Sequence, residues 1–202
     1  MKRQIFTDKK NSITWDIYPG LDYMSGNNVQ ALARIEKYVQ ELNTWNDESI
    51  AKYIVDDELF GDFIKSLIYE DYSDYKTCFA LNSEHKPMGV AVLSPGYNNA
   101  CIIEYVVIAD KYRGKKAKVN HESLGLGTRM ISSIRDNVHE FMGYYNNIEE
   151  IRGIIRRDNI PSNKAIIKAG FKAYRPARIS ELEHPSDYTT YYFRPHSKEH
   201  SI

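Results

Sequence analysis

One short segment, residues 101–108 (CIIEYVVI), constrains the fold of this chain more than any other. It is rich in β-branched residues and apolar at nearly every position, which is typical of a strand covered on both faces. Such a strand needs neighbouring strands at its edges and a layer of helices on each face. We therefore expect a sheet with this strand near its centre.

The rest of the chain supplies further strands and helices with the expected periodicities. Apolar residues recur at helical spacing over 29–42, 50–67 and 126–141, and a short helix is expected over 159–170. Alternating or β-rich runs predict strands over 12–18, 77–81, 88–93, 151–155, 171–174 and 188–193, and residues 109–124 read as a polar loop. The predicted fold class is α/β: a single mixed, mostly antiparallel sheet with helices on both faces, in one domain spanning residues 1–202.

Composition excludes several classes of protein. The 27 basic and 27 acidic residues balance to a net charge of +0, which argues against a dedicated nucleic-acid binder. No window approaches the about 18 apolar residues of a membrane span, and residues 1–15 lack a signal-peptide core, so a cytoplasmic protein is expected. The two cysteines, Cys78 and Cys101, lie in strand-like runs as buried thiols, and no Cys/His cluster predicts a metal site.

A glycine pair, Gly125-Leu126-Gly127, precedes the longest predicted helix. The first N–H groups of a helix lack intrahelical partners and attract phosphate oxygens, and glycines allow close approach. Two glycines at a helix start are also common in simple tight turns. A basic loop lies just upstream and is either a solvated surface or a source of positive charge for phosphates; its cations are Lys111, Arg113, Lys115, Lys116 and Lys118.

Residues 157–174 (RDNIPSNKAIIKAGFKAY) carry a more specific pattern. An Asn-x-x-Ser-Asn motif, a short helix and Lys-x-Gly-Phe resemble the second signature of the GNAT superfamily of N-acetyltransferases. The matching residues are Asn159, Ser162, Asn163, Lys168, Gly170 and Phe171. Upstream, the strand at 101–108 resembles the fourth strand of that family, and Gly125-Leu126-Gly127 resembles the end of its R/Q-x-x-G-x-G/A signature.

The resemblance implies an N-acetyltransferase that moves an acetyl group from acetyl-coenzyme A to a primary amine by direct attack. It implies that the pantetheine arm lies along the backbone of Val106, Val107 and Ile108. The remaining cofactor-binding residues that it implies are Arg113, Leu124, Gly125, Leu126, Gly127, Thr128, Asn159, Ser162 and Asn163. The alternative is a GNAT-like protein that binds acyl-coenzyme A without catalysis.

Two departures from the family pattern motivate that alternative. Residues 116–124 are inserted between Arg113-Gly114-Lys115 and the glycine pair, and Glu122 stands where the signature has Arg or Gln. We therefore expect Arg113 or a lysine of the insertion to supply the positive charge. Ile166 occupies the place of the tyrosine that many family members use as a general acid.

Glu104 is the candidate general base, because it interrupts an otherwise apolar strand where a lone carboxylate is costly. Its even spacing from Val106 and Ile108 predicts that the three side chains share one face. The other interpretation is a carboxylate that reaches solvent or pairs with a lysine.

The acceptor is the least constrained part of the prediction. Carboxylates gather in and after the second predicted helix, in a region that the resemblance places near the acceptor entrance; they are Asp56, Asp57, Glu58, Asp62, Glu70, Asp71 and Asp74. They favour a cationic small-molecule or peptide amine as partner, unless they merely solubilise the helix. A homodimer is left open, and neither nucleic acid nor membrane is expected.

Overall fold

The computed structural model describes residues 4–19, 29–45, 60–69, 74–119, 122–143, 147–174 and 187–195. Its strands are β1 (Gln4–Asp8), β2 (Ile13–Pro19), β3 (Lys76–Leu81), β4 (Pro87–Gly96), β5 (Ala100–Ile108), β6 (Lys116–Val119), β7 (Glu122–Gly125), β8 (Glu150–Arg156), β9 (Lys172–Tyr174) and β10 (Tyr188–Phe193). Its helices are α1 (Val29–Leu42), α3 (Phe60–Tyr69), α4 (Leu126–Asp136), α5 (Val138–Met142) and α6 (Ile160–Lys168), with the 3-10 helix η2 (Asp110–Tyr112).

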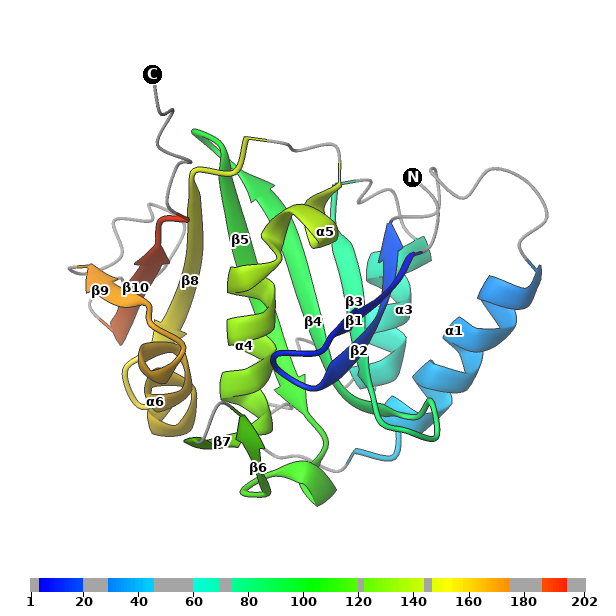
Figure 1. Cartoon of the computed structure of the whole chain (residues 1–202). Coiled ribbons are helices and arrows are strands. Elements are labelled where there is room, and N and C mark those ends of the chain that lie inside the picture. The colour runs from blue at the N-terminus through cyan, green and yellow to red at the C-terminus, as the bar shows by residue number, and fades with distance from the viewer. Residues whose placement is uncertain are drawn as a thin grey trace.

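Eight strands form one sheet in the order β1-β2-β3-β4-β5-β8-β10-β9 (Figure 1). Within it β5 and β8 are parallel, and every other neighbouring pair is antiparallel. The predicted mixed, mostly antiparallel sheet is therefore confirmed. The β-rich run at residues 101–108 forms β5, which lies between β4 and β8.

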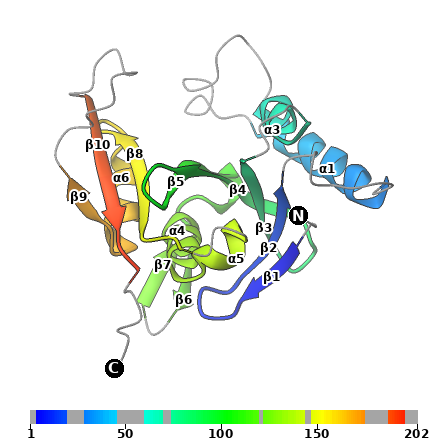
Figure 2. The same ribbon diagram turned by 90° about the horizontal axis from the view of Figure 1, so that it is seen from above.

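Two apolar clusters cover the two faces of the sheet. One lies beneath α4, α5 and α6, and includes the buried side chains of Trp15, Met130 and Phe141. The other lies beneath α1 and α3, and includes Ile35 and Phe79. Viewed from above, the sheet curves around α4 and α5, while α1 and α3 lie on its opposite side (Figure 2).

The structure adds elements that the sequence did not predict. β1 is an extra edge strand that pairs with β2 across a turn in which Ser12 has a φ of 53°. The polar loop at 109–124 contains η2 and a separate two-stranded hairpin of β6 and β7. Both were missed for the same reason. These strands are short, and they form because a partner strand pairs with them rather than because apolar residues alternate along them.

The helix expected over 126–141 is divided at Asn137 into α4 and α5. The Asn137 side-chain amide donates a hydrogen bond to the Ser133 carbonyl oxygen at 3.0 Å. Asparagine side chains compete in this way for backbone groups and interrupt helices. For the helix expected over 50–67, the described part is α3, and residues 50–59 lie outside the described residues.

Candidate active site

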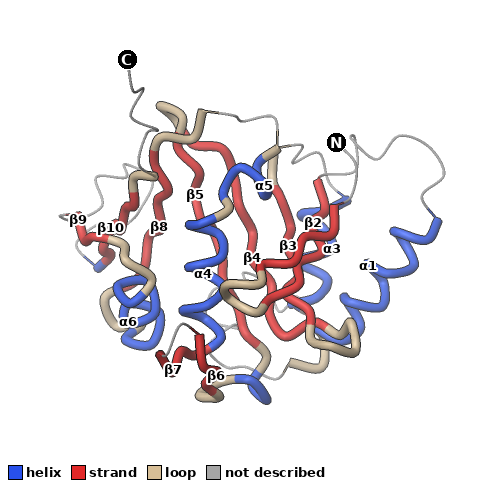
Figure 3. Tube along the Cα trace, in the orientation of Figure 1, coloured by secondary structure: helices blue, strands red, loops and turns tan. Residues whose placement is uncertain are grey.

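The site begins where β5 and β8 separate. They pair only from Ala100 to Ile103 on β5 and from Glu150 to Gly153 on β8. Beyond that point β5 remains paired with β4 up to Ile108, and β8 remains paired with β10 up to Arg156, so the strands diverge (Figure 3). In the described part of the chain, no strand pairs with residues 104–108 on the side that faces β8. Their backbone N–H and C=O groups form an open edge able to bind an amide-bearing ligand.

Val106, Val107 and Ile108 all lie on this open edge. Val106 and Ile108 pack against the cluster beneath α4, whereas Val107 packs against the cluster beneath α1 and α3. The three side chains are half-buried against the two cores, and in the described part of the chain no strand pairs with their backbone groups on the side that faces β8. Their role in cofactor binding stays a prediction.

Glu104 occupies a β-bulge at the start of the open edge. In the β4–β5 ladder, Val92 faces Tyr105 and Leu93 faces Ile103, so Glu104 is the additional residue on β5. A bulge of this kind redirects a side chain and is frequent next to active sites. The Glu104 side chain is exposed, and its carboxylate accepts a hydrogen bond from the Ser94 hydroxyl.

The bulge overturns the predicted shared face of Glu104, Val106 and Ile108. Ile103 and Val106 both pack beneath α4 although they are three residues apart, so the two-residue period is broken between them. Ser94 follows Leu93, which also packs beneath α4, and successive strand residues point to opposite faces. The bond to Ser94 therefore places the Glu104 carboxylate on the α1 and α3 side of the sheet.

Neighbouring groups respond to the Glu104 charge. Burial and then the Glu104 carboxylate raise the pKa of Tyr105, whose ring packs edge-on against Phe63 of α3 at a centroid distance of 5.5 Å. Burial and the same carboxylate raise the pKa of Cys101 to about 12, and burial also raises the pKa of Cys78. Both thiols are protonated at neutral pH and enclosed, so neither is suited to be a nucleophile.

The amino-terminal end of α4 lies beside the open edge. Gly125 is its N-cap residue and makes no side-chain cap hydrogen bond, so the N–H groups of the first turn, including those of Leu126, Gly127 and Thr128, lack a capping side chain. The Leu126 and Thr128 side chains are buried, and that of Leu124 in β7 is half-buried. This end of the helix therefore presents backbone donors and a positive partial charge.

Gly127 is required for close packing rather than for an unusual backbone conformation. A Cβ atom at Gly127 would lie 3.0 Å from Ile108 Cδ1 and 3.8 Å from Ala165 Cβ, whereas one at Gly125 would meet nothing within 4 Å. Among the described residues, the glycines with positive φ are Gly114, Gly143 and Gly170. Gly127 thus lets α4 approach both the end of β5 and α6.

The cations of the basic loop differ in their contacts. Arg113 Nε donates to the Ile108 carbonyl oxygen at 3.2 Å, and its Nη1 pairs with Asp110 at 3.1 Å. Lys111 pairs with Glu41 of α1 at 2.6 Å, and that hydrogen bond raises the pKa of Lys111. Lys116 is exposed, and the β6–β7 hairpin pairs it with Gly125. The insertion therefore returns a lysine to the start of α4.

The signature around Asn159 forms the turn between β8 and α6. Asn159 Oδ1 accepts a hydrogen bond from the Ser162 N–H at 3.3 Å, which caps α6. Asn163 Nδ2 donates to the carbonyl oxygens of Arg156 and Asn159 at 2.9 and 2.8 Å. The sequence interpretation assigned these residues to cofactor binding, and the structure gives their side chains a local role in shaping this turn.

Tyr191 of β10 is a site neighbour that sequence reasoning missed. Its hydroxyl donates to Asn163 Oδ1 at 2.7 Å, and burial raises its pKa. Only the alternation in residues 188–193 hinted at a tyrosine pointing to this face. Ile166, at the place of the family's tyrosine, is buried and lies close to Gly153 of β8, where an added Cβ would be 3.0 Å from Ile166 Cδ1.

Two further observations concern the part of the chain that the structure describes. It contains no group of three or more His, Cys, Asp or Glu side chains placed to hold a metal ion. None of its helices combines the length and apolar character needed to cross a membrane. Of the acidic residues expected near an acceptor, only Asp62 and Asp74 fall inside the described ranges; the others lie outside them.

No protein-family model matches the sequence, and no curated protein matches it. Solved structures do match. An acetyltransferase of the GNAT family from Bacillus anthracis is 13% identical, with a TM-score of 0.57 and coverage of 94% of this chain and 96% of that chain. The GNAT domain of S. lividans PAT is 13% identical, with a TM-score of 0.57 and coverage of 96% and 97%.

A third match is a chimera of spermidine N-acetyltransferase SpeG from Vibrio cholerae and hSSAT. It is 15% identical, with a TM-score of 0.54 and coverage of 78% of this chain and 91% of that chain. At such identities the likeness concerns the backbone, and it agrees with the resemblance that the two sequence motifs carry. The chain therefore has the fold of the GNAT acetyltransferases.

Proposed function

We propose that this protein transfers an acetyl group from acetyl-coenzyme A to a primary amine. The observation that carries the proposal is the open edge of β5, which starts at an exposed carboxylate and ends beside an uncapped helix start. A ligand with amides in its middle and phosphates at one end matches that sequence of groups. The GNAT fold supports acetyl transfer as the class of reaction.

The phosphates would bind at the start of α4. The N–H groups of Leu126, Gly127 and Thr128 would donate to phosphate oxygens, and the exposed Lys116 would supply a mobile cation. Arg113 is the less suitable cation, because it already donates to the end of β5 and pairs with Asp110. Asn159, Ser162 and Asn163 would support the site by holding the start of α6.

The pantetheine arm would complete the open edge of β5. The backbone groups of Val106, Val107 and Ile108 would exchange hydrogen bonds with its amides, as an added strand does. The thioester would then lie near the point where β5 and β8 part, which is where Glu104 leaves the strand.

Glu104 would act as the general base. In the proposed reaction the neutral amine attacks the thioester carbonyl, its proton passes to the Glu104 carboxylate directly or through water, and coenzyme A leaves as the thiolate. A thiol has an ordinary pKa of about 8.5, so the thiolate is a fair leaving group without a dedicated acid. Because Glu104 lies on the α1 and α3 side, the amine would approach from there.

The acceptor would be a cationic amine. The Glu104 carboxylate acts on the neighbouring Tyr105, whose ring packs against Phe63, and aromatic faces with a carboxylate attract alkylammonium groups. Of the acidic residues expected near the acceptor entrance, Asp62 and Asp74 lie in the described ranges, and they would add negative charge there. One structural match is a spermidine N-acetyltransferase chimera, and spermidine is a cationic amine.

Glu104→Gln tests the proposal, with Glu84→Gln as control, because Glu84 is exposed and forms an ion pair with Lys86 at 3.2 Å. Wild-type protein should release coenzyme A from acetyl-coenzyme A in the presence of a panel of amines. Glu104→Gln should lower that turnover about 10²- to 10⁴-fold with unchanged acetyl-coenzyme A affinity. Binding of acetyl-coenzyme A without turnover of any amine would favour the non-catalytic alternative, and no binding would refute both.

A further inference from the structure

Arg135 connects the two helices that flank the site. It lies in the last turn of α4, and its Nη1 donates to the carbonyl oxygen of Ala169, the C-cap residue of α6. Its guanidinium also lies over the Phe193 ring of β10, 5.4 Å from the centroid. A cation at the carboxyl end of a helix satisfies an orphan carbonyl and complements the helix dipole. Arg135 thus holds the end of α6 from α4.

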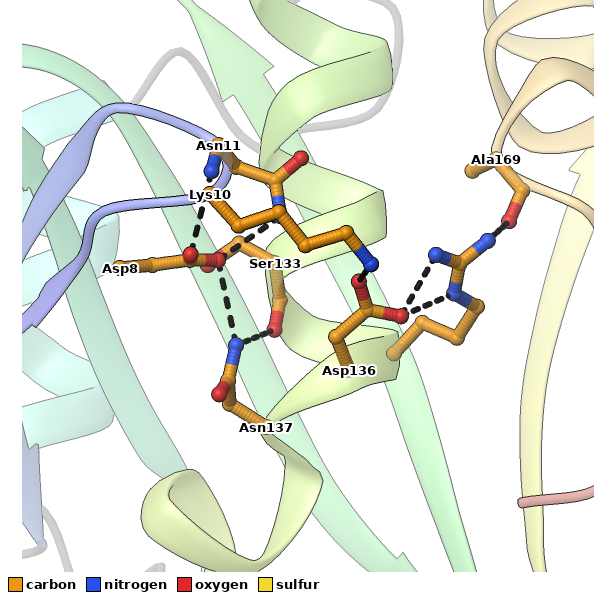
Figure 4. A network of polar contacts seen from close by, with 8 residues as sticks. Asp8, Lys10, Asn11, Ser133, Asp136, Asn137 and Ala169 are labelled. Carbon is orange, nitrogen blue, oxygen red and sulfur yellow. Dashed lines mark hydrogen bonds and ion pairs between the residues drawn. The ribbon is translucent and has the colours of Figure 1, made fainter. Parts of the chain in front are cut away.

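The guanidinium is itself fixed by a polar network. Asp136 accepts hydrogen bonds from Arg135 Nε at 2.6 Å and from Lys10 Nζ at 2.5 Å, and Lys10 lies in the β1–β2 turn (Figure 4). The Arg135 and Asp136 side chains are each only 20% exposed, which limits their alternative conformations. The position of Arg135 is therefore set by groups outside α6.

Apolar packing and one polar contact join α4 to α6, because both helices bury side chains in the same core cluster. In the ranges that the structure describes, Arg135 to Ala169 is the side-chain hydrogen bond that joins α4 to the α6 segment. Nearer the helix starts the contact is apolar, where Gly127 of α4 faces Ala165 of α6. The next residue after Ala169, Gly170, has a φ of 87°, and an added Cβ there would lie 3.0 Å from Arg135 Nη1.

We propose that Arg135 is a positioning residue, which sets the separation of α4 and α6 and thereby the width of the coenzyme A site. This inference rests on the proposed function, because the starts of these two helices are the proposed phosphate-side walls. Arg135 is eight residues from Gly127, or about 12 Å along the helix, so it acts without touching the ligand. Loss of its bond would let α6 move away from α4.

Arg129 provides a matched control. It is also an α4 arginine, and its Nη1 donates to the Asn11 carbonyl oxygen at 3.2 Å in the β1–β2 turn. Each glutamine variant removes one guanidinium: Arg129→Gln loses bonds to the Asn11 and Ser12 carbonyl oxygens, and Arg135→Gln loses its bond to the Ala169 carbonyl oxygen and its pair with Asp136. Only Arg135→Gln cuts the link to α6.

The first measurement is coenzyme A binding by calorimetry, with the KM for acetyl-coenzyme A and kcat. Arg135→Gln should weaken binding and raise that KM about tenfold, with kcat and the amine KM within about twofold of wild type. Arg129→Gln should stay within about twofold throughout, and Arg135→Lys, which keeps a charged donor, should recover most of the affinity. Equal affinity losses in the two glutamine variants, or none in Arg135→Gln, would overturn the positioning role.

The second measurement needs no ligand and separates this inference from the proposed function. Amide hydrogen exchange in residues 160–170 should accelerate at least about tenfold in Arg135→Gln and stay unchanged in Arg129→Gln. If wild-type protein binds no coenzyme A, the proposed function fails, and with it the role of the spacing. If α6 exchange does not respond to Arg135→Gln, the coupling itself is refuted, whatever the ligand does.

Discussion

The two ends of α4 are built in opposite ways. At its carboxyl end the helix is held by side chains from the β1–β2 hairpin: Trp15 Nε1 donates to the Ser133 hydroxyl at 2.9 Å, and Asn137 Nδ2 donates to Asp8 at 3.1 Å. At its amino end Gly125 offers no cap at all. One end is used for stability, and the other leaves its backbone donors for a ligand.

The anchored carboxyl end of α4 affects how an anion binds at its amino end. A helix whose far end is anchored loses little entropy when an anion binds at its start, so the donors are preorganised. This arrangement also predicts different main effects for mutations at the amino end and at the hairpin contacts of the carboxyl end. Changes at the amino end should mainly alter affinity, and loss of the hairpin contacts should mainly alter the free energy of unfolding; Arg135, which bonds to Ala169 rather than to the hairpin backbone, is set apart from both groups.

The largest effect is expected at the amino end. Gly127→Val would place a branched side chain between α4, Ile108 and Ala165, beside the helix start that we propose binds the phosphates. We expect the dissociation constant of coenzyme A to rise at least about 100-fold, or about 2.7 kcal/mol, measured by calorimetry. Overpacking would add a stability loss of about 1–3 kcal/mol. An unchanged affinity would mean that the glycine pair is only a turn.

The next effect should fall on stability alone. Ser133→Ala would leave the buried Trp15 Nε1 without its acceptor and remove a hydrogen bond to Asp8. The free energy of unfolding in urea should fall by about 1–3 kcal/mol, with coenzyme A affinity within about threefold of wild type. A larger loss of affinity than of stability would contradict the division between the two ends.

A smaller effect should identify the cation of the amino end. Lys116→Gln keeps the β6–β7 backbone pairing but removes the charge opposite Gly125. The dissociation constant should rise about threefold at low salt, in keeping with an exposed ion pair, and the difference should shrink as salt is added. Lys86→Gln, at an exposed lysine of the β3–β4 turn, is the control. If Arg113→Gln raises the dissociation constant more than Lys116→Gln does, the cation that binds the phosphates does not come from the hairpin.

The smallest effect should appear in acid, at the carboxyl end. Burial opposes the charge of Asp8, but hydrogen bonds from Ser133 and Asn11 outweigh it and lower the Asp8 pKa. The stabilising contribution of this carboxylate is therefore complete above the ordinary aspartate pKa of about 3.9 and is lost as the pH falls through the lower folded value. The stability gap between wild type and Asp8→Asn should be smaller at pH 3 than at pH 7. A stability gap that widens in acid would contradict the lowered pKa of Asp8.

Several features of this molecule were readable from the sequence because they depend on local chemistry. The apolar run of β5, the helix over residues 29–42 and the glycine stop at Gly170 each follow from residue type and spacing, and the structure confirms them. The Asn159 motif marked the start of α6 for the same reason, since a cap needs only its own turn. The glycine pair likewise marked the start of α4.

Other features depended on strands and helices meeting across the fold. The sequence could place Glu104 in β5 but not on the correct face, because the bulge exists only in the ladder with β4. β1 and the β6–β7 hairpin form by pairing, and the pattern of either strand alone is too short to predict it. The hydrogen bonds that hold the carboxyl end of α4 join Asp8, Lys10 and Trp15 to residues more than a hundred positions away. The sequence by itself determined most of the longer helices and strands and the motifs at their ends. Only tertiary structure decided register, facing and spacing, because these are set by partners distant along the chain.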